Sequence, residues 1–160
     1  MLRSPTSAHA ASLDGARLDG HTRVTLIDLG SCLSLETLER CSSGGAISYV
    51  QSRWYRAPEL LVQNRAYDAA VDMWSVGCIL AEVVGAQALF PGKDSLHQLR
   101  LIIEKLGVPT ADELERIENP QAVAYVTGLR GKAAERGTVD YGRMFPKESA
   151  DLIDLLDKLL

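Results

Sequence analysis

The stretch from residue 28 to residue 59 decides the fold, because it opens with Asp28-Leu29-Gly30 and closes with Ala57-Pro58-Glu59. Just before the closing triplet the chain reads Tyr49-Val50-Gln51-Ser52-Arg53-Trp54-Tyr55-Arg56. Residues 31–48 contain Ser, Gly and Cys with little hydrophobic periodicity, which is typical of a loop. The pattern therefore predicts one loop held between two short motifs.

The two triplets, in this order, resemble motifs of eukaryotic protein kinases. Asp28-Leu29-Gly30 is similar to the magnesium-binding DFG triplet with Leu in place of Phe, and Ala57-Pro58-Glu59 is identical to the APE triplet that closes the activation loop. The lead-in at 52–56 and the later Phe90-Pro91-Gly92 narrow the resemblance to the branch of mitogen-activated, cyclin-dependent and dual-specificity tyrosine-regulated kinases. The resemblance is nearly continuous over 23–160.

This resemblance implies a protein kinase-like fold, C-terminal lobe only, mainly α-helical with a short β element before the activation loop. The β-branched run at 23–27 predicts that element as a strand with Asp28 at its tip. Residues 1–22 lack periodicity and predict a loop or disordered leader. We expect 23–160 to form a partial kinase domain, truncated before the end of the lobe.

Composition argues against several other classes of protein. The chain has 160 residues, of which 46% are hydrophobic and 24% charged, as expected for one domain. Its net charge of -4 argues against a nucleic-acid partner, because phosphate binding needs clustered Lys and Arg. No apolar run is long enough for a membrane span. Cys32, Cys41 and Cys78 lack C-x-x-C spacing, which indicates reduced thiols and a cytoplasmic or nuclear location.

The candidate cofactor residue is Asp28. The resemblance implies that it ligates the Mg²⁺ ions that bridge the phosphates of ATP, so ATP and Mg²⁺ are the implied cofactors. Leu29 takes the position whose packing separates active from inactive states, and Gly30 completes the triplet. From the residues alone, an aspartate that opens a turn with glycine is the alternative. The family spacing would place the catalytic loop at about residues 5–15, and Thr6-Ser7-Ala8-His9-Ala10-Ala11 contains neither the catalytic Asp nor the metal-binding Asn.

The candidate activation and substrate residues are Tyr49, Ser52, Arg53 and Arg56. Tyr49 is a candidate phosphorylation site, and Arg53 and Arg56 have the guanidinium forks that bind phosphate. The alternative is that Tyr49 packs while both arginines lie on the surface. Ser52 matches a family hydroxyl that hydrogen-bonds the catalytic Asp and Lys. The resemblance implies protein substrates, with Arg56 favouring Ser/Thr-Pro sites, and an upstream activating kinase.

Three further residues have implied structural roles. Glu59 resembles the family carboxylate that pairs with an Arg beyond the last helix, and a buried carboxylate without that partner is destabilising. Apolar residues at 69–84 predict a buried helix that contains Trp74. Asp72 lies in this apolar setting and matches the residue that holds the catalytic loop; an ordinary carboxylate near a helix N-terminus is the alternative.

Downstream, the patterns predict three more helices. Apolar residues at helical spacing indicate a helix over 96–106, Thr110-x-x-Glu113 has capping-box spacing, and Ser149 precedes a leucine-rich stripe. The tract 119–146 has weak periodicity and resembles the insert that marks this kinase branch.

The sequence thus predicts an ATP-dependent protein serine/threonine kinase, represented by a fragment. Phosphoryl transfer also needs a Gly-rich loop, a Lys-Glu pair, a catalytic Asp and a metal-binding Asn. Only the metal-binding Asp28 is visible, so we expect the 160-residue chain alone to be inactive. A non-catalytic kinase-like binding scaffold is the alternative, because fold and activity are separable.

Overall fold

The structure is a computed structural model that describes residues 25–28, 30, 32, 34, 37, 52–64, 67–129 and 140–160. The chain divides into two units, Met1–Cys32 and Leu33–Leu160. The described part of the second unit is built mainly from helices, as the sequence predicts. They are η2 (Arg53–Tyr55), α2 (Pro58–Leu61), α3 (Ala70–Gly85), α4 (Ser95–Leu106), α5 (Ala111–Glu115), α6 (Pro120–Leu129), α7 (Tyr141–Met144) and α8 (Ala150–Leu159).

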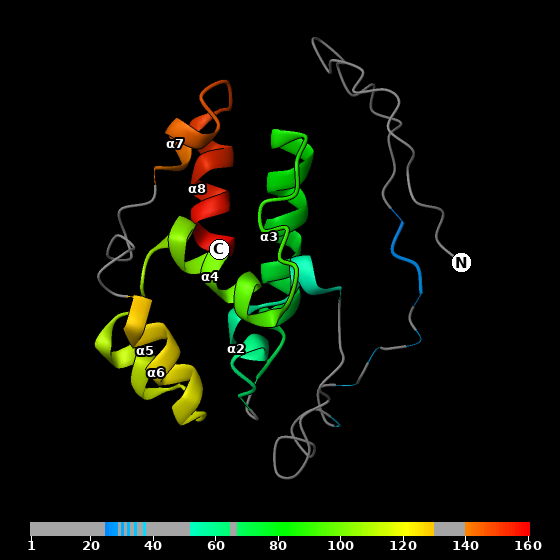
Figure 1. Cartoon of the computed structure of the whole chain (residues 1–160). Helices are drawn as coiled ribbons and strands as arrows, with labels where there is room; N and C mark the ends of the chain where they lie inside the picture. Colours follow the sequence, from blue (N-terminus) through cyan, green and yellow to red (C-terminus); the bar gives the residue numbers. More distant parts are fainter. Residues whose placement is uncertain are drawn as a thin grey trace. The chain divides into compact units, whose positions relative to one another are not determined.

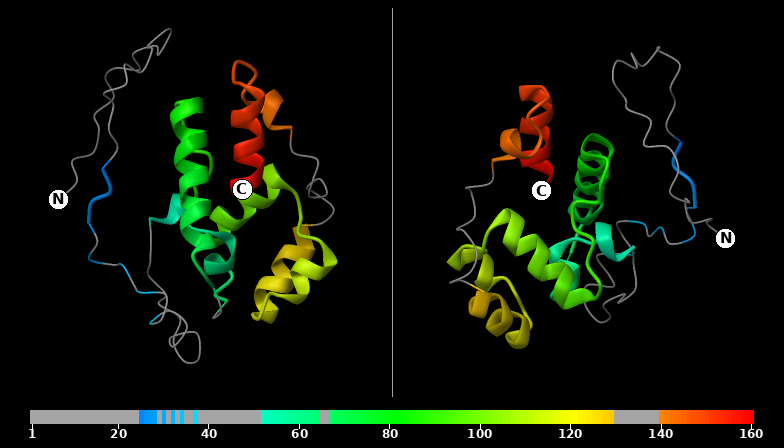
Figure 2. Two further views of the ribbon diagram at one scale, coloured as in Figure 1. Left: turned by 180° about the vertical axis from the view of Figure 1, so that it is seen from behind. Right: turned by 45° about the horizontal axis from the view of Figure 1, so that its top comes forward.

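Helix α3 is the longest of these helices and packs along α8, as both orientations show (Figures 1 and 2). One face of α3 carries Trp74, Cys78 and Ala81 into the core. The Trp74 ring stacks on Phe90 with a centroid distance of 5.9 Å. A glycine is needed at position 77, because a Cβ there would lie 2.9 Å from Leu159 Cβ. The helix predicted over 69–84 is therefore present, with bounds shifted by one residue.

Helix α4 begins and ends where its capping residues require. The Asp94 carboxylate accepts a hydrogen bond from His97 N at 2.8 Å, which satisfies one free N–H of the first turn. Gly107 ends the helix with a φ of 90°, a conformation that favours glycine, and donates to Ile103 O at 2.9 Å. Four of the five predicted apolar residues are buried: Leu99, Ile102, Ile103 and Leu106.

The predicted capping box is confirmed at α5. Glu113 N donates to Thr110 Oγ1 at 3.3 Å, and Thr110 N donates back to the Glu113 carboxylate at 2.8 Å. Ser149 caps α8 by accepting from Leu152 N at 3.3 Å, also as predicted. The tract 119–146 is more regular than its weak periodicity indicates, because it contains α6 and α7; residues 130–139 lie outside the described part.

The strand predicted over 23–27 is not formed at the residues that the structure describes. Thr25, Leu26 and Ile27 have no regular secondary structure and are exposed, Leu26 by 88%. The physical reason is pairing: a β-branched run becomes a strand only where a neighbouring strand accepts its backbone hydrogen bonds. The mainly helical fold is unaffected.

The expectation that the helix over 69–84 is buried is wrong for one of its faces. Ile79 is 51% exposed and Val83 is 61% exposed, and the exposed Met73 and Val76 lie near them on the helix. These four residues form the uncovered face of α3. Among the described residues, no helix has the length and apolar character needed to cross a membrane.

Candidate functional site

Asp28 is exposed and has an unusual backbone. Its φ is 64°, in the left-handed region that few residues other than glycine adopt, although Asp is one of the more frequent exceptions. Such backbone strain is concentrated at functional sites. Gly30 does not have a positive φ, and a Cβ there would lie 3.4 Å from the Asp28 carboxylate, an ordinary contact. The described geometry therefore singles out Asp28 more than Gly30; Leu29 lies outside the described residues.

The three predicted substrate-side residues that the structure describes lie on one tight turn, residues 52–56, which we call the Arg53 turn. Tyr55 N donates to Ser52 O at 3.1 Å and Arg56 N donates to Arg53 O at 3.2 Å. Ser52 is exposed, as is Arg53, whereas Arg56 is half-buried. Tyr49 lies outside the described residues.

The Arg53 turn is hydrogen-bonded to the segment 91–94, which we call the Gly92 loop. Arg53 Nη1 donates to Lys93 O at 2.8 Å, and Trp54 Nε1 donates to Gly92 O at 3.0 Å. The Gln98 side chain accepts from Gly92 N at 2.9 Å and donates to Trp54 O at 3.3 Å. Two hydrogen bonds thus join the turn directly to a loop about forty residues further on, and Gln98 of α4 bridges the same two segments with two more.

A second set of contacts holds the turn to α3. Tyr55 Oη donates to the Glu82 carboxylate at 2.7 Å, and Ser75 Oγ donates to Tyr55 O at 2.9 Å. The hydrogen bond to Glu82 is the main reason that the pKa of Tyr55 is raised to about 12, with burial adding to it. Burial raises the pKa of the neighbouring Cys78 thiol to about 12, with Glu82 adding to it, so Cys78 is not a reactive thiolate.

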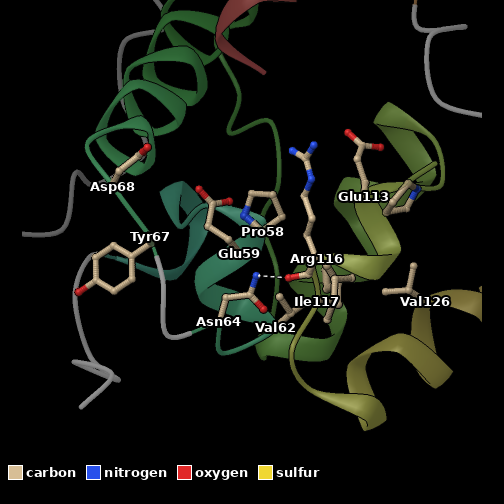
Figure 3. A pocket seen from close by; sticks show the side chains of 12 residues that line it. Pro58, Glu59, Val62, Asn64, Tyr67, Asp68, Glu113, Arg116, Ile117 and Val126 are labelled. Atoms are coloured by element: carbon tan, nitrogen blue, oxygen red, sulfur yellow. Dashed lines mark hydrogen bonds between the residues drawn. The ribbon is translucent and has the colours of Figure 1, made fainter. Parts of the chain in front are cut away.

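Glu59 lines a partly open pocket of about 520 Å³, to whose walls α2, α4, α5 and α6 contribute (Figure 3). Asn64 closes one side by donating to Arg116 O at 3.0 Å and accepting from Glu118 N at 3.2 Å. The walls are largely apolar, with Pro58, Val62, Leu99, Pro109, Ile117 and Val126, and the polar lining includes Glu59, Asp68, Glu113 and Arg116.

The Glu59 carboxyl is partly removed from water in this pocket. Burial raises its pKa, a backbone hydrogen bond opposes the rise, and Asp68 adds to it. Among the described residues no Lys or Arg forms an ion pair with Glu59. The Glu59 carboxylate is thus unpaired among the described residues, at the position where the family resemblance implies an ion pair with an Arg.

Trp74 and Asp72 have different surroundings on α3. Trp74 is buried, and its Nε1 has no hydrogen-bond acceptor among the described residues. Asp72 is exposed in the first turn of the helix rather than enclosed by apolar residues. At this position near the helix N-terminus the backbone dipole stabilises its negative charge.

Sequence reasoning missed Gln98 and Glu82, which join the Arg53 turn to α4 and α3. Gln98 carried a signal that could have been used: it is a polar residue on the buried side of the 96–106 helix, next to Leu99. A buried amide needs partners for both its donor and its acceptor. Glu82 carried no comparable signal, because it is only half-buried and a carboxylate at such a position needs no protein partner.

A metal ion would need ligands beyond those described. No group of three or more His, Cys, Asp or Glu side chains suited to a metal ion occurs among the described residues. The Asp28 carboxylate could supply one oxygen ligand to a hard cation, which needs several such ligands.

The mainly helical architecture of the described residues agrees with the protein kinase-like lobe that the sequence motifs imply. The family model described as "Protein kinase domain" matches residues 17–160, so the chain belongs to the protein kinase family. The match begins ahead of the boundary predicted at residue 23.

The similar proteins include mitogen-activated protein kinases, which confirms the branch that the sequence motifs resemble. Mitogen-activated protein kinase spk1 of Schizosaccharomyces pombe is 41% identical over 167 residues, covering 100% of this chain and 44% of that protein. Extracellular signal-regulated kinase 2 of Dictyostelium discoideum is 41% identical over 145 residues, covering 89% of this chain and 38% of that protein. The chain thus spans less than half the length of these relatives.

Proposed function

We propose that this chain is the C-terminal-lobe part of a protein serine/threonine kinase that transfers phosphate from ATP to protein substrates. The observation that carries the proposal is the Arg53 turn, which holds Ser52, Arg53 and Arg56 together between α3 and the Gly92 loop. The mitogen-activated relatives support the reaction class.

Asp28 is the proposed ligand of Mg²⁺ and so the contact to ATP in the complete enzyme. The ion would neutralise charge on the phosphates during transfer. The exposed carboxylate and the left-handed backbone support this role, since strained backbone conformations are concentrated at functional sites. Leu29 and Gly30 complete the triplet around it.

The Arg53 turn is the proposed recognition site for protein substrates. The guanidinium groups of Arg53 and Arg56 would bind a phosphate on Tyr49, added by an upstream kinase, and Arg56 would favour a Pro after the acceptor Ser or Thr. The half-buried position of Arg56 supports a role in shaping a surface rather than in free solvent contact. Ser52 would contact the catalytic groups.

Glu59, Asp72 and Trp74 are the proposed structural residues of the lobe. Glu59 would pair with a guanidinium in its pocket, and Asp72 would hold the catalytic loop against the uncovered face of α3. The partly buried Glu59 carboxylate supports the first role, because no Lys or Arg pairs with it among the described residues. The exposed apolar side chains beside Asp72 support the second role, because no described residue buries them.

The test is Mg²⁺-dependent phosphorylation of Ser-Pro peptides by a complete kinase domain that contains this chain. Asp28→Asn should lower kcat by at least about 100-fold, since the metal contributes several kcal/mol to transition-state stabilisation. Asp112→Asn, which removes an exposed carboxylate on α5, is the matched control and should leave kcat unchanged. The 160-residue chain alone should show no transfer.

Equal turnover of the Asp28→Asn variant and the parent at saturating Mg²⁺ would show that Asp28 is not the metal ligand. A folded complete domain without any phosphoryl transfer would instead favour the binding scaffold.

A further inference from the structure

Gln98 is the only polar side chain in the buried core of the described residues, with an exposure of 0%. Burying a carboxamide is unfavourable unless both of its ends are hydrogen-bonded. Both ends are, and their partners lie on different segments: Gly92 N on the Gly92 loop and Trp54 O on the Arg53 turn. A single side chain on α4 therefore spans the two segments.

The fit around this carboxamide is tight. A Cβ at Gly92 would overlap Gln98 Oε1 and lie 2.7 Å from Gln98 Cα. The loop backbone thus approaches α4 as closely as a residue without a side chain allows. Trp54 Nε1 donates to the Gly92 carbonyl and Arg53 Nη1 to the Lys93 carbonyl, so the directions of both side chains depend on where Gln98 holds the loop.

We propose that Gln98 is a positioning residue for the Arg53 turn. Its carboxamide fixes the register of the turn against the Gly92 loop and thereby the direction of the Arg53 guanidinium. That the turn receives substrate rests on the proposed function, whereas the ordering of the turn by Gln98 does not.

Gln98→Glu tests the proposal because its effect can be reversed by pH. An ionised carboxylate still accepts from Gly92 N but faces Trp54 O without a hydrogen to donate, so the turn should separate from the loop. A protonated carboxyl has both a donor and an acceptor and restores the arrangement. Burial should move this titration above the ordinary Glu pKa of about 4.3.

The readout is the indole N–H resonance of Trp54 in the full 160-residue chain, assigned with Trp54→Phe. In Gln98→Glu the chemical shift of this resonance should change at pH 8, and the indole N–H should exchange with solvent about tenfold faster, as expected for one lost hydrogen bond. On acidification the resonance should return toward its position in the parent chain. The charged or titratable groups on the segments around Gln98 are Arg53, Lys93, Asp94 and His97. The parent chain, which carries all four, controls for their own titration.

Gln121→Glu, which adds the same charge at an exposed position of α6, is the matched control and should leave the Trp54 resonance unchanged. The Trp74 indole reports whether the core is intact. If Gln98→Glu does not fold, Gln98→Met, which keeps the length but has no hydrogen-bonding group, should displace Trp54 at every pH. A Trp54 resonance unchanged in the folded variant would overturn the proposal.

A kinetic measurement separates this proposal from the proposed function. In an active complete domain, Gln98→Glu should raise the KM for a Ser-Pro peptide several-fold more at pH 8 than at pH 6.5, with a smaller change in kcat. A displaced indole with an unchanged KM would overturn the link to substrate. An inactive parent would refute the proposed function, and the indole readout would still decide whether Gln98 orders the turn.

Discussion

The two faces of α3 have similar residues but different surroundings. On one face Cys78 and Ala81 are each 1% exposed, packed in the core that α3 shares with α8. On the other, Val76 is 47% exposed and Val83 is 61% exposed. Both faces are apolar, yet only one is covered by the described residues.

The difference shows that apolar character alone does not say what covers a helix. An exposed set of large apolar side chains on one helix face usually marks a contact surface. Asp72 lies next to this uncovered face, and the relatives are more than twice as long as the chain. We therefore propose that further parts of a complete kinase domain cover this face.

Shortening a side chain should cost more stability in the core between α3 and α8 than on an exposed face. Two neighbouring leucines of α8 test this. Leu156→Ala should lower the free energy of unfolding by about 2–5 kcal/mol, because Leu156 is 0% exposed and its loss leaves a cavity. Leu155→Ala, at a residue that is 45% exposed, should cost less than about 1 kcal/mol. Denaturant unfolding of both variants measures the difference, and equal losses would contradict the assigned core.

The uncovered face can be tested with the same substitution on both sides of α3. Ala81→Asn places an amide in the core and should cost about 1–3 kcal/mol, whereas Val83→Asn in this chain should change stability by less than about 0.5 kcal/mol. Val→Asn changes helix propensity little, whereas Ala→Asn itself costs up to about 0.7 kcal/mol in propensity, so only a loss at Ala81 beyond that amount reports burial.

In a complete kinase domain, Val83→Asn should become destabilising by about 1–3 kcal/mol, since the face would then be buried. Thermal unfolding of the chain and of the complete domain, each with and without the substitution, makes the comparison. An unchanged melting temperature in the complete domain would show that nothing covers Val83 there.

Whether the sequence predicted a structural feature depends on how far apart in the sequence its interacting residues lie. The caps at Thr110 and Ser149 were predicted because the partners lie three residues apart. At the described residues 25–27 the predicted strand is not formed, since strand pairing depends on distant residues. The Gln98 and Glu82 contacts join residues 44 and 27 positions apart, and a single sequence does not show such pairs. The roles of Asp28, Tyr49 and the arginines stay predictions.

The smallest expected effect concerns Glu59, whose pKa is raised in the folded chain. An acid with a raised pKa favours the folded state when it is protonated, so its contribution to stability is largest below the unfolded pKa of about 4.3. That contribution is lost as the pH rises through the folded pKa. Near neutral pH the charged, partly buried carboxylate should therefore destabilise the chain.

Glu59→Gln removes this charge and should stabilise the 160-residue chain at pH 7 by less than about 1 kcal/mol, because solvent screens part of the effect. The gain should disappear near pH 4, where the parent carboxyl is protonated in both states. Glu115→Gln, at an exposed carboxylate of α5, is the matched control. The measurement is the melting temperature of each variant from pH 4 to pH 8. In a complete domain the sign should reverse, because the carboxylate would then have its guanidinium and losing one partner of such a pair is costly. A gain in both proteins would show that no cation enters the Glu59 pocket.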